Sequence, residues 1–130
     1  MLPDMSKVYV SNLGAHEIGV INVKSQKLIK TIYVGSSHVL VSLNLDKRLS
    51  EINGIVNPTQ TPDGRYIYAA DGDSHQVAVI DTRTDSIVKT IPAGKNPWRA
   101  YVSPDGTKVV VPNNDDQTVS VIDVKSNKVI

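Results

Sequence analysis

The side chains of this 130-residue chain with the clearest capacity for chemistry are its three histidines and two acidic loops. The loops, at residues 71–73 (Asp-Gly-Asp) and 113–116 (Asn-Asn-Asp-Asp), offer the hard oxygen ligands that calcium accepts. Neither loop is followed by the bidentate glutamate of an EF-hand. Aspartate and asparagine also favour turns, so a calcium site and a simple turn both remain open interpretations.

Several other chemistries are excluded. The chain has no cysteine, which rules out disulfides, thiolate metal sites and cysteine nucleophiles. No Ser-His-Asp arrangement, phosphate-binding glycine loop or Cys/His metal spacing is present. A net charge of +1 with dispersed lysines and arginines argues against a strong non-specific grip on nucleic acid or anionic lipid. The sequence has no apolar run long enough for an ordinary transmembrane helix. Its first residues lack the apolar core of a signal peptide, so any export leader would lie outside it.

The elements that position these residues repeat at a fixed spacing. Residues 67–71 and 79–82 reappear 42 residues later, at 109–113 and 121–124. The Thr-Pro-Asp-Gly at 61–64 reappears at the same offset as Ser-Pro-Asp-Gly. Self-similarity at roughly 40–45 residues is typical of propeller blades and solenoid arrays.

A third copy lies upstream, at an offset of 59 residues. Residues 8–12 align with 67–71, and 28–32 with 87–91. His16 and His75 share one repeat position, which Gln117 fills in the last copy, and this favours a structural loop role for both histidines. The 17 extra residues lie between Gly35 and Asn57. They are either an insertion in one loop or, as we prefer, the start of a separate blade whose remainder is lost.

Each copy predicts short strands separated by tight turns. Proline presets φ in the Pro-Asp-Gly turns, and a β-rich run follows each of them. Alternating valines then predict strands over 76–81 and 118–123, with an outer strand over 86–91. Four short antiparallel strands in about 42 residues make a propeller blade. No helix is predicted beyond one turn near 46–51. Asp81, Asp123 and Asn22 are expected to accept hydrogen bonds from amides of the following turns.

These motifs resemble a known repeat. Val8-Tyr9-Val10-Ser11-Asn12 is similar to the Tyr-Val-Thr-Asn element of the YVTN family of β-propeller repeats, and residues 91–94, 103–106 and 121–123 match the same repeat. The resemblance covers the chain apart from residues 1–6 and about 37–55. It implies a fold rather than an activity, because similar propellers serve as surface-layer proteins, envelope binding proteins, lactonases and the haem d1 domain of nitrite reductase. It also implies a periplasmic or extracellular location.

The resemblance further implies where a ligand would bind. In such propellers the innermost strand follows the glycine and lines the central channel, which here places His38, Asn57, Trp98 and Arg99 at the channel. A neutral His38 imidazole could ligate haem iron or another metal, or act as a base; the alternative is a surface or inter-blade histidine. Trp98 and Arg99 could stack on and pair with an anionic ligand; the alternative for Trp98 is packing between blades. No catalytic residue, metal-ligand set or cofactor follows from the sequence.

We therefore expect an all-β chain that forms a partial β-propeller of about three four-stranded antiparallel blades. The expected divisions are blade 1 over about 7–35, an irregular or truncated blade over 36–54, blade 2 over about 55–94 and blade 3 over about 95–130. Because known propellers close with about four to eight blades, both terminal blades should expose apolar faces. Such faces predict a longer propeller, a protein partner or self-association. The expected function is a non-catalytic binding or scaffold module; the alternative is part of a propeller enzyme or redox protein, lactonase-like or haem d1-binding.

Overall fold

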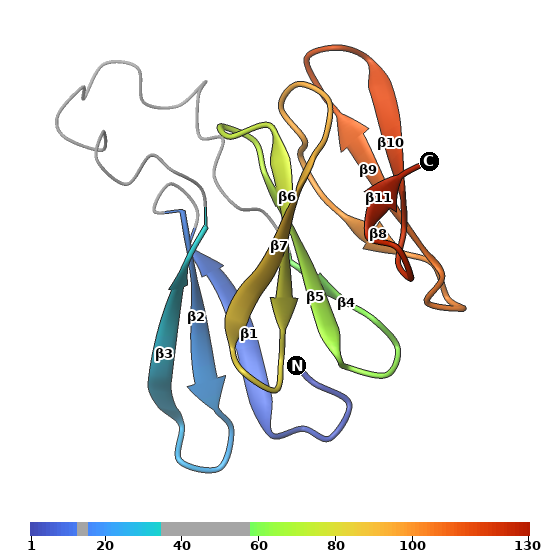
Figure 1. Cartoon of the computed structure of the whole chain (residues 1–130). Coiled ribbons are helices and arrows are strands. Elements are labelled where there is room, and N and C mark those ends of the chain that lie inside the picture. Colours follow the sequence, from blue (N-terminus) through green and yellow to red (C-terminus); the bar gives the residue numbers. More distant parts are fainter. Residues whose placement is uncertain (13–15, 35–57) are drawn as a thin grey trace, which may run out of the picture.

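The computed structural model describes residues 1–12, 16–34 and 58–130, which form strands and no helix. Three antiparallel sheets lie side by side (Figure 1). The first contains β1 (Lys7–Asn12), β2 (Glu17–Asn22) and β3 (Lys27–Tyr33). The second contains β4 (Thr59–Gln60), β5 (Tyr66–Asp71), β6 (Gln76–Asp81) and β7 (Ser86–Pro92). The third contains β8 (Tyr101–Val102), β9 (Lys108–Asn113), β10 (Thr118–Asp123) and β11 (Lys128–Val129). The expected fold class, a partial propeller of antiparallel sheets, is confirmed.

The first sheet has one strand fewer than the others among the described residues. Strand β1 pairs with β2 in the register that β5 makes with β6, so β1 is the counterpart of the second strand of the later sheets. A register shift after Val20 in β2 recurs after Val79 in β6, at the same repeat position. The repeat in the sequence is therefore a repeat of register and irregularity as well as of strand order. The turn expected near 46–51, and both interpretations of residues 36–54, fall outside the described residues.

Each sheet has two apolar faces, because its middle strands carry Val, Ile or Ala at successive positions. We call the face toward the next sheet along the chain the forward face, and the opposite one the rear face. Cross-strand partners share a face, so the forward face of the second sheet carries Tyr68, Ala70, Val77 and Val79. Its rear face carries Ile67, Ala69, Ala78 and Ile80.

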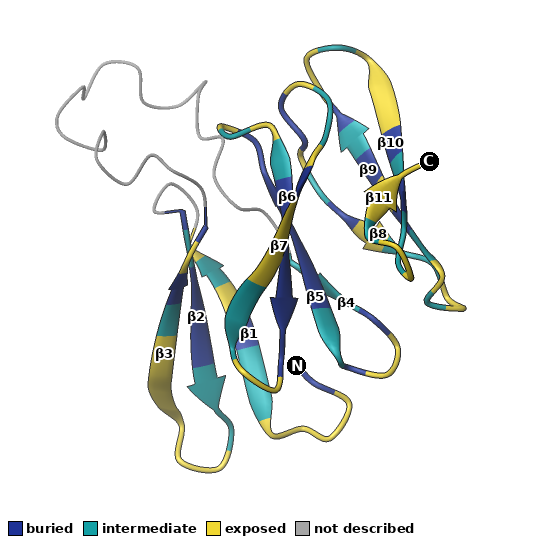
Figure 2. Cartoon of the chain, in the orientation of Figure 1, coloured by how far each residue is buried: buried dark blue, intermediate teal, exposed yellow. Residues whose placement is uncertain are grey.

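Two hydrophobic clusters join the three sheets. In one, the forward face of the first sheet, including Tyr9, Ile18 and Val20, packs on the rear face of the second. In the other, the forward face of the second sheet packs on Val109, Val111 and Ile122 of the third. Figure 2 shows the outcome: β5 and β6 are buried along most of their length, whereas β3 is exposed over its first half, β10 at its start and β11 throughout.

The first repeat begins earlier than the sequence indicated. The amide of Leu2 donates to the carbonyl of Lys7 at 2.9 Å, and the amide of Met5 donates to Leu2 at 2.9 Å. The Pro-Asp-Gly turns at 61–64 and 103–106 make the same two bonds. Residues 2–5 therefore form the same turn, although the resemblance stopped at residue 7. Met5 stands at the glycine position with a φ of 59°, and this substitution hides the turn in the sequence.

None of the described segments forms a helix that is long and apolar enough to cross a membrane.

Candidate functional site

The β1–β2, β5–β6 and β9–β10 loops hold polar side chains that connect adjacent sheets. His16, His75 and Gln117 occupy the same place in these loops, and all three have positive φ, between 51° and 56°. The His16 and His75 carbonyls each accept a backbone hydrogen bond, from Val34 at 2.8 Å and Ala93 at 3.0 Å. The shared repeat position therefore corresponds to one backbone conformation, as the repeat register suggested.

The His16 side chain lies against two carboxylates of the next sheet. Its Nε2 atom is 2.8 Å from Asp73 Oδ2, and its Nδ1 atom is 3.3 Å from Asp71 Oδ1. His16 is 5% exposed and Asp71 fully buried. Burial raises the pKa of the Asp73 carboxyl, an effect that the neighbouring His16 opposes. The cluster links the first two sheets at their loop ends.

Asp71 is unusual in this cluster because neither of its carboxylate oxygens has a hydrogen-bond partner among the described residues. The His16 Nδ1 atom, 3.3 Å from Asp71 Oδ1, contacts this carboxylate without hydrogen-bond geometry. Its repeat counterpart, Asn113, is fully bonded: Oδ1 accepts from the Gly94 amide at 3.1 Å, and Nδ2 donates to Thr118 and Ser120 hydroxyls. In the second sheet, Ala78 stands at the position of Ser120 and provides no such hydroxyl. The sequence marked Asp71 as a possible calcium or turn residue of its loop, but it did not indicate that this carboxylate is buried.

Polar contacts also join the second and third sheets at this end. His75 Nδ1 accepts from the Asn96 amide at 3.0 Å, and Asn96 Nδ2 donates to Asp115 at 3.1 Å. Asp116 accepts from the Lys95 amide at 2.8 Å and from Thr118. The second acidic loop thus uses its carboxylates in local and inter-sheet hydrogen bonds. Within the part of the chain that the structure describes, no three His, Asp or Glu side chains are placed to hold a metal ion.

The predicted ligand residues divide between described and undescribed segments. His38 and Asn57 lie outside the described residues. Trp98 is 43% exposed, and its amide donates to the Pro112 carbonyl at 3.1 Å. The Arg99 guanidinium lies 5.0 Å from the centre of the Tyr101 ring, which is itself 48% exposed. Arg99 therefore meets an aromatic side chain that sequence reasoning did not select.

The turns at the opposite end of the sheets behave as expected. Asp81 Oδ1 accepts from the Arg83 amide, Asp123 Oδ2 from the Ser126 amide and Asn22 Oδ1 from the Ser25 amide, each at 2.9 Å. These bonds confirm the predicted turn role of the three residues. The Arg65 guanidinium also donates two hydrogen bonds to the Asp81 carboxylate, from Nε at 3.1 Å and from Nη2 at 2.8 Å.

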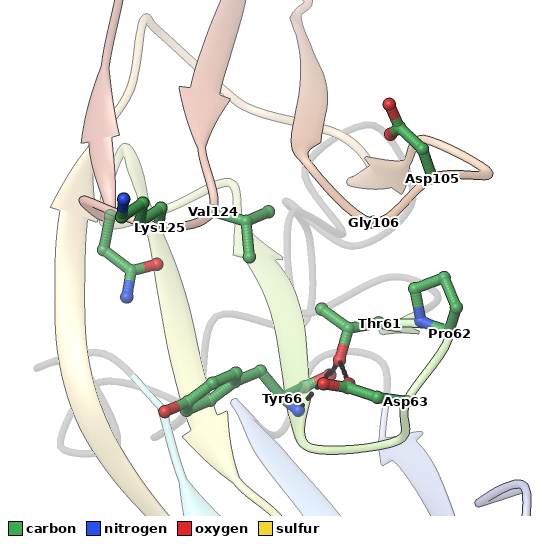
Figure 3. A pocket seen from close by; sticks show the side chains of 9 residues that line it. Thr61, Pro62, Asp63, Tyr66, Asp105, Gly106, Val124 and Lys125 are labelled. Atoms are coloured by element: carbon green, nitrogen blue, oxygen red, sulfur yellow. Dashed lines mark hydrogen bonds between the residues drawn. The ribbon is translucent and has the colours of Figure 1, made fainter.

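Two repeat-equivalent grooves open beside the Pro-Asp turns. One, of about 380 Å³, lies between the second and third sheets and is lined by both Pro-Asp-Gly turns and by Tyr66 (Figure 3). The other, of about 430 Å³, lies between the first two sheets. In Figure 3 the Asp63 carboxylate points back to its own turn, where it accepts from the Thr61 hydroxyl at 2.5 Å. Asp105 is bonded in the same way to Ser103 and Thr107, and these bonds lower its pKa to about 2. The Asp63 and Asp105 carboxylates in this groove therefore accept hydrogen bonds from their own turns.

Tyrosine hydroxyls bridge adjacent sheets near these turns. Tyr68 donates to Asn127 Oδ1 at 2.6 Å, and Tyr9 donates to Asp85 Oδ1. Asp85 and Asn127 occupy equivalent turn positions with φ of 50° and 52°. Burial raises the pKa of Tyr68 to about 12 and raises that of Tyr9 as well. Each of these tyrosines adds one side-chain hydrogen bond between adjacent sheets to the apolar packing that joins them.

No protein-family model matches the chain, and no curated protein matches it. Solved structures do. The chain aligns over its full length with hydrazine synthase of Kuenenia stuttgartiensis, at a TM-score of 0.80 and 23% identity. It also aligns over its full length with the dihydro-heme d1 dehydrogenase NirN in complex with DHE, at a TM-score of 0.75 and 20% identity. The fold is propeller-like. The chain spans 33% and 24% of the lengths of these two proteins.

Proposed function

We propose that the chain is a non-catalytic binding or scaffold module, a partial propeller of the YVTN type that holds a partner on its exposed surfaces. The observation that supports this proposal is a difference between equivalent positions. Val77, on the forward face of the second sheet, is fully buried, whereas its counterpart Val119 in the third sheet is 59% exposed. A valine in a middle strand is suited to burial, so the exposed face is suited to a partner.

We also propose that His38, Asn57, Trp98 and Arg99 bind small ligands, at the channel positions that the resemblance to propeller repeats implies. The exposed Trp98 ring and the Arg99 guanidinium support this assignment, because an aromatic face and a fixed cation together suit a planar anion. A protein partner would use the sheet faces instead.

The second candidate function is part of a propeller enzyme or redox protein. Two observations favour it: one structure with this fold is a hydrazine synthase, and the other is a dihydro-heme d1 dehydrogenase. At identities of 23% and 20%, these similarities support a shared fold but do not establish a shared activity.

Absorption spectra and metal analysis of the purified chain separate the two candidates. A scaffold module gives no haem band and no stoichiometric metal, before or after incubation with haem. A haem band or bound metal that disappears in His38→Ala, but persists in the control His75→Ala, would overturn the scaffold proposal. His75 is an exposed loop residue whose imidazole accepts one hydrogen bond, from the Asn96 amide, so the control removes a histidine together with that single bond.

A further inference from the structure

The two outermost faces of the described sheets are complementary to each other. On the third sheet, Val110 pairs with Val121 and Pro112 with Val119, so these four residues share the forward face. On the first sheet, Val8 pairs with Ile21 and Val10 with Gly19 on the rear face. Val119 is 59% exposed, Val10 is 40% and Leu28, beside Ile21, is 62%. Both faces are apolar, and no described sheet covers either of them.

The interior of the chain shows what covers such faces. Twice, a forward face packs on a rear face of the following sheet. The free rear face nearly repeats the one that the second sheet covers: Val8, Val10 and Ile21 stand where Val109, Val111 and Ile122 stand. The free forward face keeps two of the covered valines, since Val119 and Val121 stand where Val77 and Val79 stand. The chain thus carries both halves of a contact that it already makes internally.

We propose that a second copy of this chain covers these faces, with the forward face of the third sheet of one copy packed on the rear face of the first sheet of the other. This inference rests on the proposed binding or scaffold function and names its partner. The contact is head-to-tail, so a two-fold dimer contains it twice and brings together six of the described sheets. Six lies within the range of four to eight blades at which propellers close.

The proposed contact between copies differs from the two contacts inside the chain at one turn on its edge. A Cβ added to Gly64 would lie 2.5 Å from Pro3 Cδ, and one added to Gly106 would lie 2.9 Å from Pro62 Cδ. Met5 occupies the equivalent position on the first sheet, so its side chain meets Pro104 of the second copy. The sheets must therefore stand farther apart at this edge than inside the chain, and Met5 limits the affinity of the contact.

Analytical ultracentrifugation of the full chain over a micromolar concentration range tests the proposal. The parent chain should sediment as a reversible dimer. Val119→Asp and Val10→Asp, on the forward and rear faces, should each raise the dimer Kd at least about a hundredfold, because each disrupts both copies of the contact. Circular dichroism confirms that each variant keeps its β-structure, as expected for exposed positions. A parent chain that stays monomeric, or a dimer that resists both substitutions, overturns the proposal.

Mixing the two variants tests the head-to-tail geometry. The unaltered forward face of Val10→Asp can pair with the unaltered rear face of Val119→Asp, so the mixture should regain one contact and form a heterodimer. Contacts between two forward faces or two rear faces would give no such rescue. Absence of rescue therefore overturns the proposed arrangement.

Met5→Gly tests the register. This substitution restores the glycine of the interior turns and should lower the dimer Kd about tenfold; an unchanged or higher Kd contradicts the register. The absorption spectra test a different proposal from sedimentation. Bound haem would refute the scaffold function without affecting sedimentation. A monomer that captures no second copy would refute this inference alone.

Discussion

At the residue scale, most acidic side chains serve the turns in which they lie. Asp4, Asp63 and Asp105 occupy the same turn position in successive copies, and each accepts hydrogen bonds from a residue two positions away. These bonds stabilise the ionised carboxylate and lower the pKa of all three groups. Acid should therefore weaken the same turn in every sheet.

The Asp105 turn gives a pH prediction with a definite sign. The hydroxyl of Ser103 contributes most to lowering the Asp105 pKa to about 2. A depressed folded-state pKa stabilises the fold above the unfolded value of about 3.9, and the effect is lost as the pH falls toward 2. Asp105→Asn should make the thermal midpoint less sensitive to pH between about 4.5 and 2.5. An unchanged pH dependence, with Asp115→Asn as an exposed control, would contradict this.

Asp71 gives a prediction from the comparison of two copies. Asp71→Asn combined with Ala78→Ser transfers the amide–hydroxyl pair of Asn113 and Ser120 into the second sheet. The double variant should be more stable than the sum of the single changes by about 0.5–1.5 kcal/mol, the range of one hydrogen bond. Urea unfolding of all four proteins in the cycle measures this coupling. A coupling near zero would show that the transplanted pair does not form.

At the scale of strands and sheets, the tyrosine bridges add hydrogen bonds to the apolar packing between adjacent sheets. Tyr68→Phe removes the hydrogen bond to Asn127 and keeps the buried ring, so it should cost about 1 kcal/mol of unfolding free energy. The raised Tyr68 pKa adds stability that is fully present below about pH 10 and is lost as the pH rises toward 12.

Denaturant unfolding at pH 8 and pH 11 checks both effects. Tyr68→Phe should lose less stability than the parent between these values. Tyr101→Phe is the control, because its ring is half-exposed and remains beside Arg99. An equal effect of the two substitutions would count against the bridge.

The strands and their turns were largely predictable from the sequence, whereas contacts between copies were not. The valine alternation and the Pro-Asp-Gly turns indicated β5, β6, β9 and β10, and Asp81 and Asp123 bond as their positions suggested. Local patterns suffice for these features because they depend on neighbours in sequence. The meeting of His16 with Asp71 depends on how two sheets pack, and no local pattern records that distance. The turn at 2–5 escaped notice because methionine replaces glycine.

At the scale of the whole molecule, position along the array decides the effect of identical substitutions. Val77→Ala should cost about 2 kcal/mol of unfolding free energy, because this fully buried valine lies between two sheets. The equivalent Val119→Ala should change the stability of a dilute monomer by less than about 0.5 kcal/mol. Chemical unfolding at submicromolar concentration measures both values. Equal costs would mean that Val119 is covered in the monomer.

The equivalence of forward and rear faces allows the number of sheets to change by duplication or loss of a repeat unit in the gene. Because every sheet offers its successor the kind of surface that it receives from its predecessor, an in-frame duplication of one unit inserts a new sheet without requiring a new interface. Loss of one unit is tolerated in the same way. Selection can then alter individual units while the array persists, and Met5 and Asp71 are the kind of departure that this permits.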